Sequence, residues 1–68
     1  MIDIDNRMMY SVLSSALESL REAAREEWAL AKECPSNHPM WTVHMTTGME
    51  CSRIASALAA ARKAIREG

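Results

Sequence analysis

The sequence is poor in the residues that build sheets and tight turns. Its 68 residues include no phenylalanine, one tyrosine, two tryptophans, two glycines and two prolines. Strands favour aromatic residues, and turns favour glycine and proline. The chain is instead rich in alanine, glutamate, arginine, leucine and methionine, which favour helices. We therefore predict an all-α protein.

Cysteine and long apolar runs are also scarce. The two cysteines are too few for a small secreted protein stapled by disulfides, which favours a reducing compartment. The first six residues are acidic and lack the basic and then apolar order of a signal peptide. No apolar run approaches the roughly 20 residues needed to cross a membrane. We expect a cytoplasmic protein with no membrane partner.

The chain has no excess of positive charge, because 8 Lys and Arg face 9 Asp and Glu, for a net charge of −1 at pH 7. Sequence-independent binding of nucleic acid needs many phosphate contacts from lysine and arginine, so nucleic acid is not expected as a partner. The densest basic group lies near the end of the chain: Arg53, Arg62, Lys63 and Arg66. We interpret it as the solvated end of a helix.

Apolar residues recur at helical spacing in the first half of the chain. The main stripe consists of Leu13, Leu17, Leu20, Ala24, Trp28 and Ala31. A helix is predicted from about residue 6 to residue 33, with Asp5 as its N-cap. Pro35 ends it, because proline disfavours the α conformation in the residue before it. Two stabilising ion pairs are expected along this helix, Glu18–Arg21 and Glu22–Arg25.

A loop at residues 34 to 39 is predicted to lead into a second helix, from about residue 40 to residue 67. We expect Asn37 or His38 to cap it, with Pro39 in its first turn. Residues 41 to 46 alternate in polarity as a strand does, but the chain offers no second strand for pairing. The predicted apolar stripe of the second helix consists of Ile54, Leu58, Ala61 and Ile65. It lies beside a ridge of small residues, Gly48, Ser52 and Ser56.

The two predicted helices form a single helical-hairpin domain over residues 1 to 68, which cannot hide all of its apolar surface. A chain this short buries only about 60% of its unfolded surface. Beside the main stripe, the first helix carries four more apolar residues: Met9, Val12, Ala16 and Ala23. We therefore expect a homodimer or a higher oligomer, most simply an antiparallel four-helix bundle.

One set of residues has metal-ligating chemistry: Cys34, His38, His44 and Cys51. The short spacing of two ligands that is typical of zinc sites is missing. If the second helix begins near residue 39, Cys51 lies about 17 Å from the loop. We therefore expect no metal, no cofactor and no disulfide between the two cysteines.

Catalysis is also not expected. A nucleophile needs a base beside it and a third group that orients the base. His44 with Thr46 or Thr47, and Glu50 nearby, would form an exposed group without a sheltered pocket. We predict that the protein is not an enzyme.

Six methionines and two tryptophans remain to be explained. Methionine adapts to irregular binding surfaces, and tryptophan is enriched in interface hot spots. We predict that a protein partner contacts five of these residues: Met40, Trp41, Met45, Met49 and Trp28. Met8 and Met9 are expected to cluster with them.

A small, methionine-rich, near-neutral helical hairpin resembles the host-takeover proteins that phages encode, such as quorum-sensing antiactivators and anti-CRISPR proteins. The resemblance is one of size and composition. It implies a non-enzymatic protein that binds and inhibits a bacterial regulatory or defence protein in the cytoplasm of the host cell.

Short motifs also resemble the phage anti-CBASS sponges, small helical oligomers that sequester cyclic oligonucleotides. The similar positions are Tyr10 with Leu13-Ser14, Arg25 where that family tends to carry Lys, Pro39-x-Trp41, and Thr47-x-Met49-Glu50. The resemblance implies that Tyr10 stacks on a base, Arg25 holds a phosphate and Thr47 forms a hydrogen bond at a subunit interface. The chain departs from the family at Glu50, where Gln is expected, and at Thr46, where Arg is expected. An arginine would supply charge-assisted bonds to phosphate.

Overall fold

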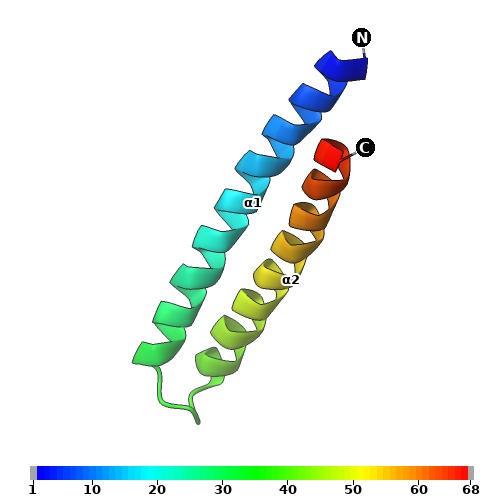
Figure 1. Cartoon of the computed structure of the whole chain (residues 1–68). Helices are drawn as coiled ribbons and strands as arrows, with labels where there is room; N and C mark the ends of the chain where they lie inside the picture. Colours follow the sequence, from blue (N-terminus) through cyan, green and yellow to red (C-terminus); the bar gives the residue numbers. More distant parts are fainter. Residues whose placement is uncertain (1, 68) are drawn as a thin grey trace.

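The computed structural model describes residues 2–67, and the side chains of residues 6–67. It contains two helices, α1 (Ile2–Glu33) and α2 (Pro39–Glu67), which run antiparallel and contact each other (Figure 1). The start of α1 and the end of α2 lie at the end of the hairpin opposite the loop. The predicted all-α hairpin is thus confirmed.

The first helix begins earlier than predicted. Since α1 starts at Ile2, Asp5 lies within the helix, and its prediction as the N-cap is wrong. No glycine or proline interrupts residues 2 to 33, so nothing in the backbone stops the helix from continuing to the start of the described chain.

His38 caps the second helix. After a turn closed by the hydrogen bond from the His38 amide to the Pro35 carbonyl (2.9 Å), the His38 ring Nδ1 accepts the amide of Met40 at 3.1 Å. The His38 carbonyl accepts the amide of Trp41 at 3.0 Å. The imidazole therefore accepts the backbone hydrogen bond that a Ser or Asp side chain usually accepts at an N-cap. With this start, residues 40 to 46 are helical.

The buried core of the hairpin is a narrow seam. Among the side chains of residues 6–67, four apolar residues are buried, Leu17, Ala24, Ala31 and Ala55, of which only Leu17 is large. Their spacing of seven residues along α1, and that of Gly48 and Ala55 along α2, is the repeat of two helices that pack as a coiled coil. The other members of the predicted α1 stripe are half-buried beside them, so that stripe is confirmed.

The predicted stripe of α2 is only partly right. Leu58 and Ile65 are half-buried, but Ile54 and Ala61 are exposed, and so is Ser56 of the predicted ridge. The seam instead follows positions about one residue away, including Gly48 and Ala55. Small side chains at these positions let the helix axes approach closely, and larger apolar residues are left beside the seam.

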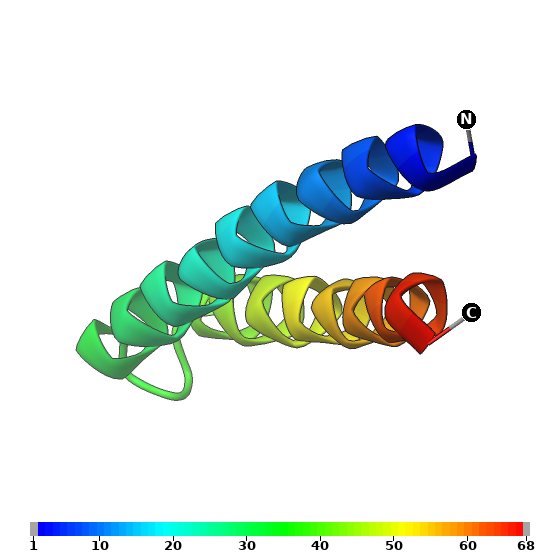
Figure 2. The same cartoon turned by 45° about the horizontal axis from the view of Figure 1, so that its top comes forward.

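The hairpin is a rod with a large surface for its mass. Its extents are 53 × 14 × 12 Å and its radius of gyration is 15.5 Å, whereas a compact domain of this length has about 11 Å. From the direction of Figure 2, the helices are close near the loop and diverge toward the chain ends.

The closest approach in the seam depends on Gly48, over which the indole of Trp28 lies. A Cβ at position 48 would lie 2.6 Å from Trp28 Cδ1 and nearer still to Nε1. We predict that Gly48→Ala lowers the free energy of unfolding by about 1–2 kcal/mol, because the overpacking outweighs the helix propensity gained. Thermal and urea unfolding followed by circular dichroism measure this.

Removing the indole is the control for that prediction. In a Trp28→Ala background the same change should be neutral or stabilising, since only the propensity gain remains. A Gly48→Ala protein as stable as the wild type would contradict the close packing of Trp28 on Gly48.

Candidate functional site

One side of the hairpin carries an almost continuous apolar surface, called here the apolar face. Its α1 residues are Met9, Val12, Leu13, Ala16, Leu20, Ala23 and Leu30, and its α2 residues are Val43, Ile54, Leu58, Ala61 and Ile65. Most of them lie three, four, seven or eleven residues from the next on the same helix, which is close to a whole number of helical turns, so they share one side of it. Val12 is 66% and Ile54 48% exposed. An exposed apolar surface of this length is typical of a protein–protein contact.

At the open end of the hairpin, the apolar face is hollowed into a groove. A volume of about 620 Å³ lies between Met8, Met9, Val12 and Leu13 of α1 and Ala61, Ala64 and Ile65 of α2. At the loop end the face instead presents exposed large side chains, Leu30 and Val43, with Met40 beside them. The two ends of the face therefore differ in shape.

The apolar face contains one polar contact between the helices. His44 Nδ1 donates to Glu27 Oε2 at 2.6 Å, and both side chains are largely shielded from solvent. Because an ionised carboxylate only accepts hydrogen bonds, Nδ1 must carry the proton. Sequence reasoning placed His44 beside Thr46, Thr47 and Glu50. Its actual partner lies 17 residues away and is recognisable only once the register of the hairpin is known.

The two ion pairs predicted within α1, Glu18–Arg21 and Glu22–Arg25, do not form. Among residues 6–67 the ion pairs with a nitrogen–oxygen distance within 4 Å are Glu27–His44 and Glu50–Arg53, the second at 3.5 Å on the surface of α2. Exposed ion pairs of this kind contribute little to stability. Arg21 and Arg25 form no ion pair within the described side chains, so their guanidinium groups are available for other contacts.

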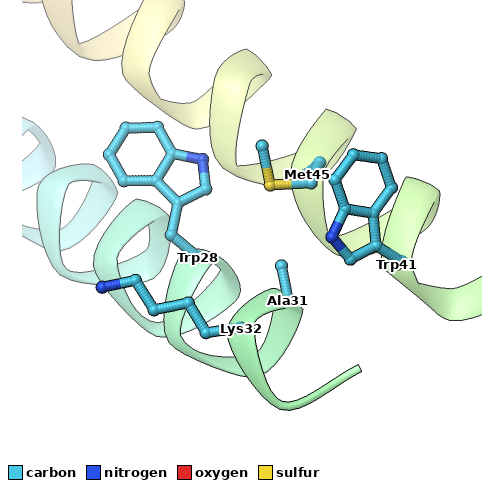
Figure 3. Close-up of a pocket in the computed structure, with 5 residues that line it drawn as sticks. All are labelled: Trp28, Ala31, Lys32, Trp41 and Met45. Atoms are coloured by element: carbon cyan, nitrogen blue, oxygen red, sulfur yellow. The ribbon is translucent and has the colours of Figure 1, made fainter. Parts of the chain in front are cut away.

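The other side of the hairpin has a hollow of about 460 Å³ near the loop, called here the tryptophan hollow. Trp28, Ala31 and Lys32 of α1 and Trp41 and Met45 of α2 line it. The two indoles stand on either side of the hollow, Met45 lies beside Trp41, and the Lys32 chain follows the edge (Figure 3). Aromatic walls and a flexible thioether fit an apolar side chain of a partner.

The structure brings together three of the five residues predicted to contact a partner: Trp28, Trp41 and Met45. Met40 and Met49 are 42% and 56% exposed and lie outside the lining of the hollow. The expected clustering of Met8 and Met9 with them is wrong, because α1 separates Met9 from the loop by about 36 Å.

Farther along the same side lies a polar hollow of about 300 Å³, called here the arginine hollow. Ser14, Leu17, Glu18, Arg21, Arg25 and Arg62 line it. Arg62 Nη1 donates to Ser14 Oγ at 3.2 Å, and its guanidinium lies 5.5 Å from the centre of the Tyr10 ring. This is cation–π distance. The interpretation of Arg62 as part of a solvated helix end is therefore wrong, since it is half-buried across the seam.

The arginine hollow has an excess of positive charge. Within the described side chains, no carboxylate lies within 4 Å of the guanidinium of Arg21, Arg25 or Arg62, and Glu18 is the one acidic residue in the lining. Guanidinium groups gathered in this way repel each other and attract an anion, which they bind with paired N–H donors.

Two of the three residues predicted to bind a cyclic nucleotide meet at the arginine hollow. Arg25 lines it, and Tyr10 reaches it through its contact with Arg62. Thr47 is exposed and does not line it, because it lies about 22 Å along α2 from Arg62. By its helical position, Thr47 lies on the side of α2 that carries Ile54 and the rest of the apolar face.

The described residues include neither a group of metal-ligating side chains nor a membrane-spanning helix. No group of three His, Cys, Asp or Glu side chains within residues 6–67 is placed to hold an ion. Cys34 and Cys51 are both free and half-buried. Neither α1 nor α2 has a stretch apolar enough, over the length required, to cross a membrane.

The hairpin thus offers an apolar face on one side and two hollows, one aromatic and one basic, on the other. No protein-family model, curated protein or solved structure matches the chain, so its function is inferred from these three surfaces.

Proposed function

We propose that the protein is a non-enzymatic binding protein that acts as a homodimer and inhibits a second protein by covering part of its surface. The observation that carries the proposal is the apolar face, which a single hairpin leaves exposed. By the resemblance to phage host-takeover proteins, the target is a bacterial regulatory or defence protein in the host cytoplasm.

The exposed area supports a second copy of the chain as the occupant of the apolar face. The hairpin exposes 5155 Å², whereas a compact monomer of its mass exposes about 4,300 Å². The difference, about 850 Å², is close to the roughly 800 Å² that each partner buries in a standard stable interface. Two hairpins joined through this face form a four-helix bundle.

The tryptophan hollow is the proposed contact for the target. It lies on the side of the hairpin away from the apolar face, so dimerisation leaves it accessible. Large, rigid indoles bury much apolar area at little cost in entropy, which is why tryptophan recurs in hot spots. Lys32 at the edge favours a target segment with an apolar side chain next to an acidic one.

The arginine hollow supports a second candidate, a sponge that sequesters cyclic oligonucleotides. Arg21, Arg25 and Arg62 offer charge-assisted donors for phosphate, and the Tyr10 ring nearby offers a surface for base stacking. Thr47 shares the side of α2 that the proposed dimer covers, which is where the resemblance requires a residue of the subunit interface.

The dimer is tested by placing a charge on the apolar face. In Ile54→Lys an ammonium group would have to be buried between the subunits without a partner, so we expect the mass measured by size-exclusion chromatography with light scattering to fall from dimer to monomer. Helix content by circular dichroism should remain. Ser56→Lys is the matched control, because residue 56 lies about 200° around α2 from residue 54. A wild-type monomer at micromolar concentration would contradict the proposal.

Target binding is tested with Trp41→Ala. The immobilised protein is exposed to lysate of the cells in which it acts, and retained proteins are quantified by mass spectrometry. We expect one protein to be retained by the wild type and about fivefold less by Trp41→Ala, which corresponds to the 1 kcal/mol of a hot-spot residue. Thr42→Ala, the exposed neighbour, should retain it fully. Equal retention by both variants would rule out the tryptophan hollow as the contact.

The sponge is tested by calorimetry with a panel of cyclic di- and trinucleotides. This candidate predicts binding heat with at least one of them and about tenfold weaker binding by Arg25→Ala, because a charged donor to phosphate is lost. Arg53→Ala is the control, since Arg53 lies outside the hollow and pairs with Glu50. A flat thermogram for the wild-type dimer would exclude the sponge and leave the protein-binding proposal standing.

A further inference from the structure

We infer that the two copies pack antiparallel, with Ile54 beside the twofold axis, so that the loop end of each hairpin fills the groove at the open end of the other. This inference rests on the proposed homodimer and adds its orientation and register. The occupant of the apolar face is a second copy of this chain.

The first support is the difference in shape between the two ends of the apolar face. The open end is a groove between Val12 and Ile65, with purely apolar side chains around it. The loop end bears large apolar side chains, Leu30 and Val43, which are 45% and 49% exposed. Antiparallel packing places these side chains over the apolar groove of the other copy. Parallel packing places groove against groove, and Leu30 and Val43 against their own symmetry mates.

The second support comes from the centre of the face. Along the rod, the point midway between the groove and the side chains of Leu30 and Val43 falls near Leu20 on α1 and near Ile54 on α2. In a twofold arrangement, residues at this level face their own symmetry mates. Ile54 is large and 48% exposed, and the apolar face near this level also carries the half-buried Leu20 and three small residues, Ala16, Ala23 and Cys51. Each Ile54 therefore meets the Ile54 of the other copy across the axis, with small side chains beside the pair that leave room for it.

The third support is electrostatic. The apolar face carries the Glu27–His44 pair, which lies toward the loop. In a parallel dimer the two pairs would meet at the interface, with two carboxylates at close range. In the antiparallel dimer they lie about 21 Å apart along the rod, because Glu27 is seven residues from the level of Leu20. The repulsion between them is weaker at this distance, because the Coulomb energy falls as the separation grows.

The orientation is tested by distances between spin labels on single cysteines, in a background with Cys34→Ser and Cys51→Ser. For Val12→Cys, the antiparallel dimer predicts two labels about 24 Å apart along the rod, plus the width of the interface, in double electron–electron resonance. A parallel dimer would bring them within about 10 Å, the distance between packed helices. Circular dichroism and light scattering confirm that each labelled protein is a folded dimer.

The centre is tested by oxidation. Ile54→Cys in the same background should form an interchain disulfide under mild oxidation, since the two residues lie beside the axis, whereas Ser56→Cys should not. A short Val12 distance, or equal cross-linking of positions 54 and 56, would overturn the antiparallel register while leaving the dimer in place. A monomeric mass for the cysteine-free background and for the wild type would instead defeat the homodimer itself.

Discussion

The close approach of two helices along a seam of small residues determines the other features of this molecule. Ala24, Ala31, Gly48 and Ala55 let the helices come close, as the contact of Trp28 with Gly48 shows. Small side chains bury little area, however, and burial contributes only about 25 cal/mol per Å². Within the part of the chain whose side chains the structure describes, Leu17 is the one large side chain that is fully buried in the seam. The larger apolar residues are therefore left on the flanks, and a hairpin of this kind gains stability by covering them with another chain.

The two polar contacts at the edges of the seam complement this packing. Glu27–His44 joins the helices toward the loop, and Arg62–Ser14 with Tyr10 joins them toward the open end. Alanines packed on glycine and alanine would tolerate a shift along the helix, whereas a polar group that must meet a partner does not. Each contact is worth only about 1 kcal/mol. Their positions near opposite ends of the rod make them effective in fixing its register.

Most of the fold could be predicted because its signals are local. The periodicity around Leu17, the proline that ends α1 and the capping position of His38 are each set by neighbours in sequence. The predicted apolar stripe of α2 was placed on the wrong residues because Gly48 and Ala55, which occupy the seam, are small and only weakly hydrophobic. The pairing of His44 and the position of Arg62 depend on which residues of one helix face which of the other. Only the three-dimensional register supplies that information, so the tryptophan hollow was partly predicted and the arginine hollow largely missed.

The separation of the surfaces onto two sides has a consequence for binding. The apolar face would be covered in the proposed dimer, while the hollows around Trp41 and Arg25 lie on the opposite side of each hairpin. In the proposed dimer, self-association and ligand binding would therefore not compete for area, and two identical sites would face away from each other. A target with two copies of the recognised surface would be bound more tightly than one copy permits, because the second contact is intramolecular.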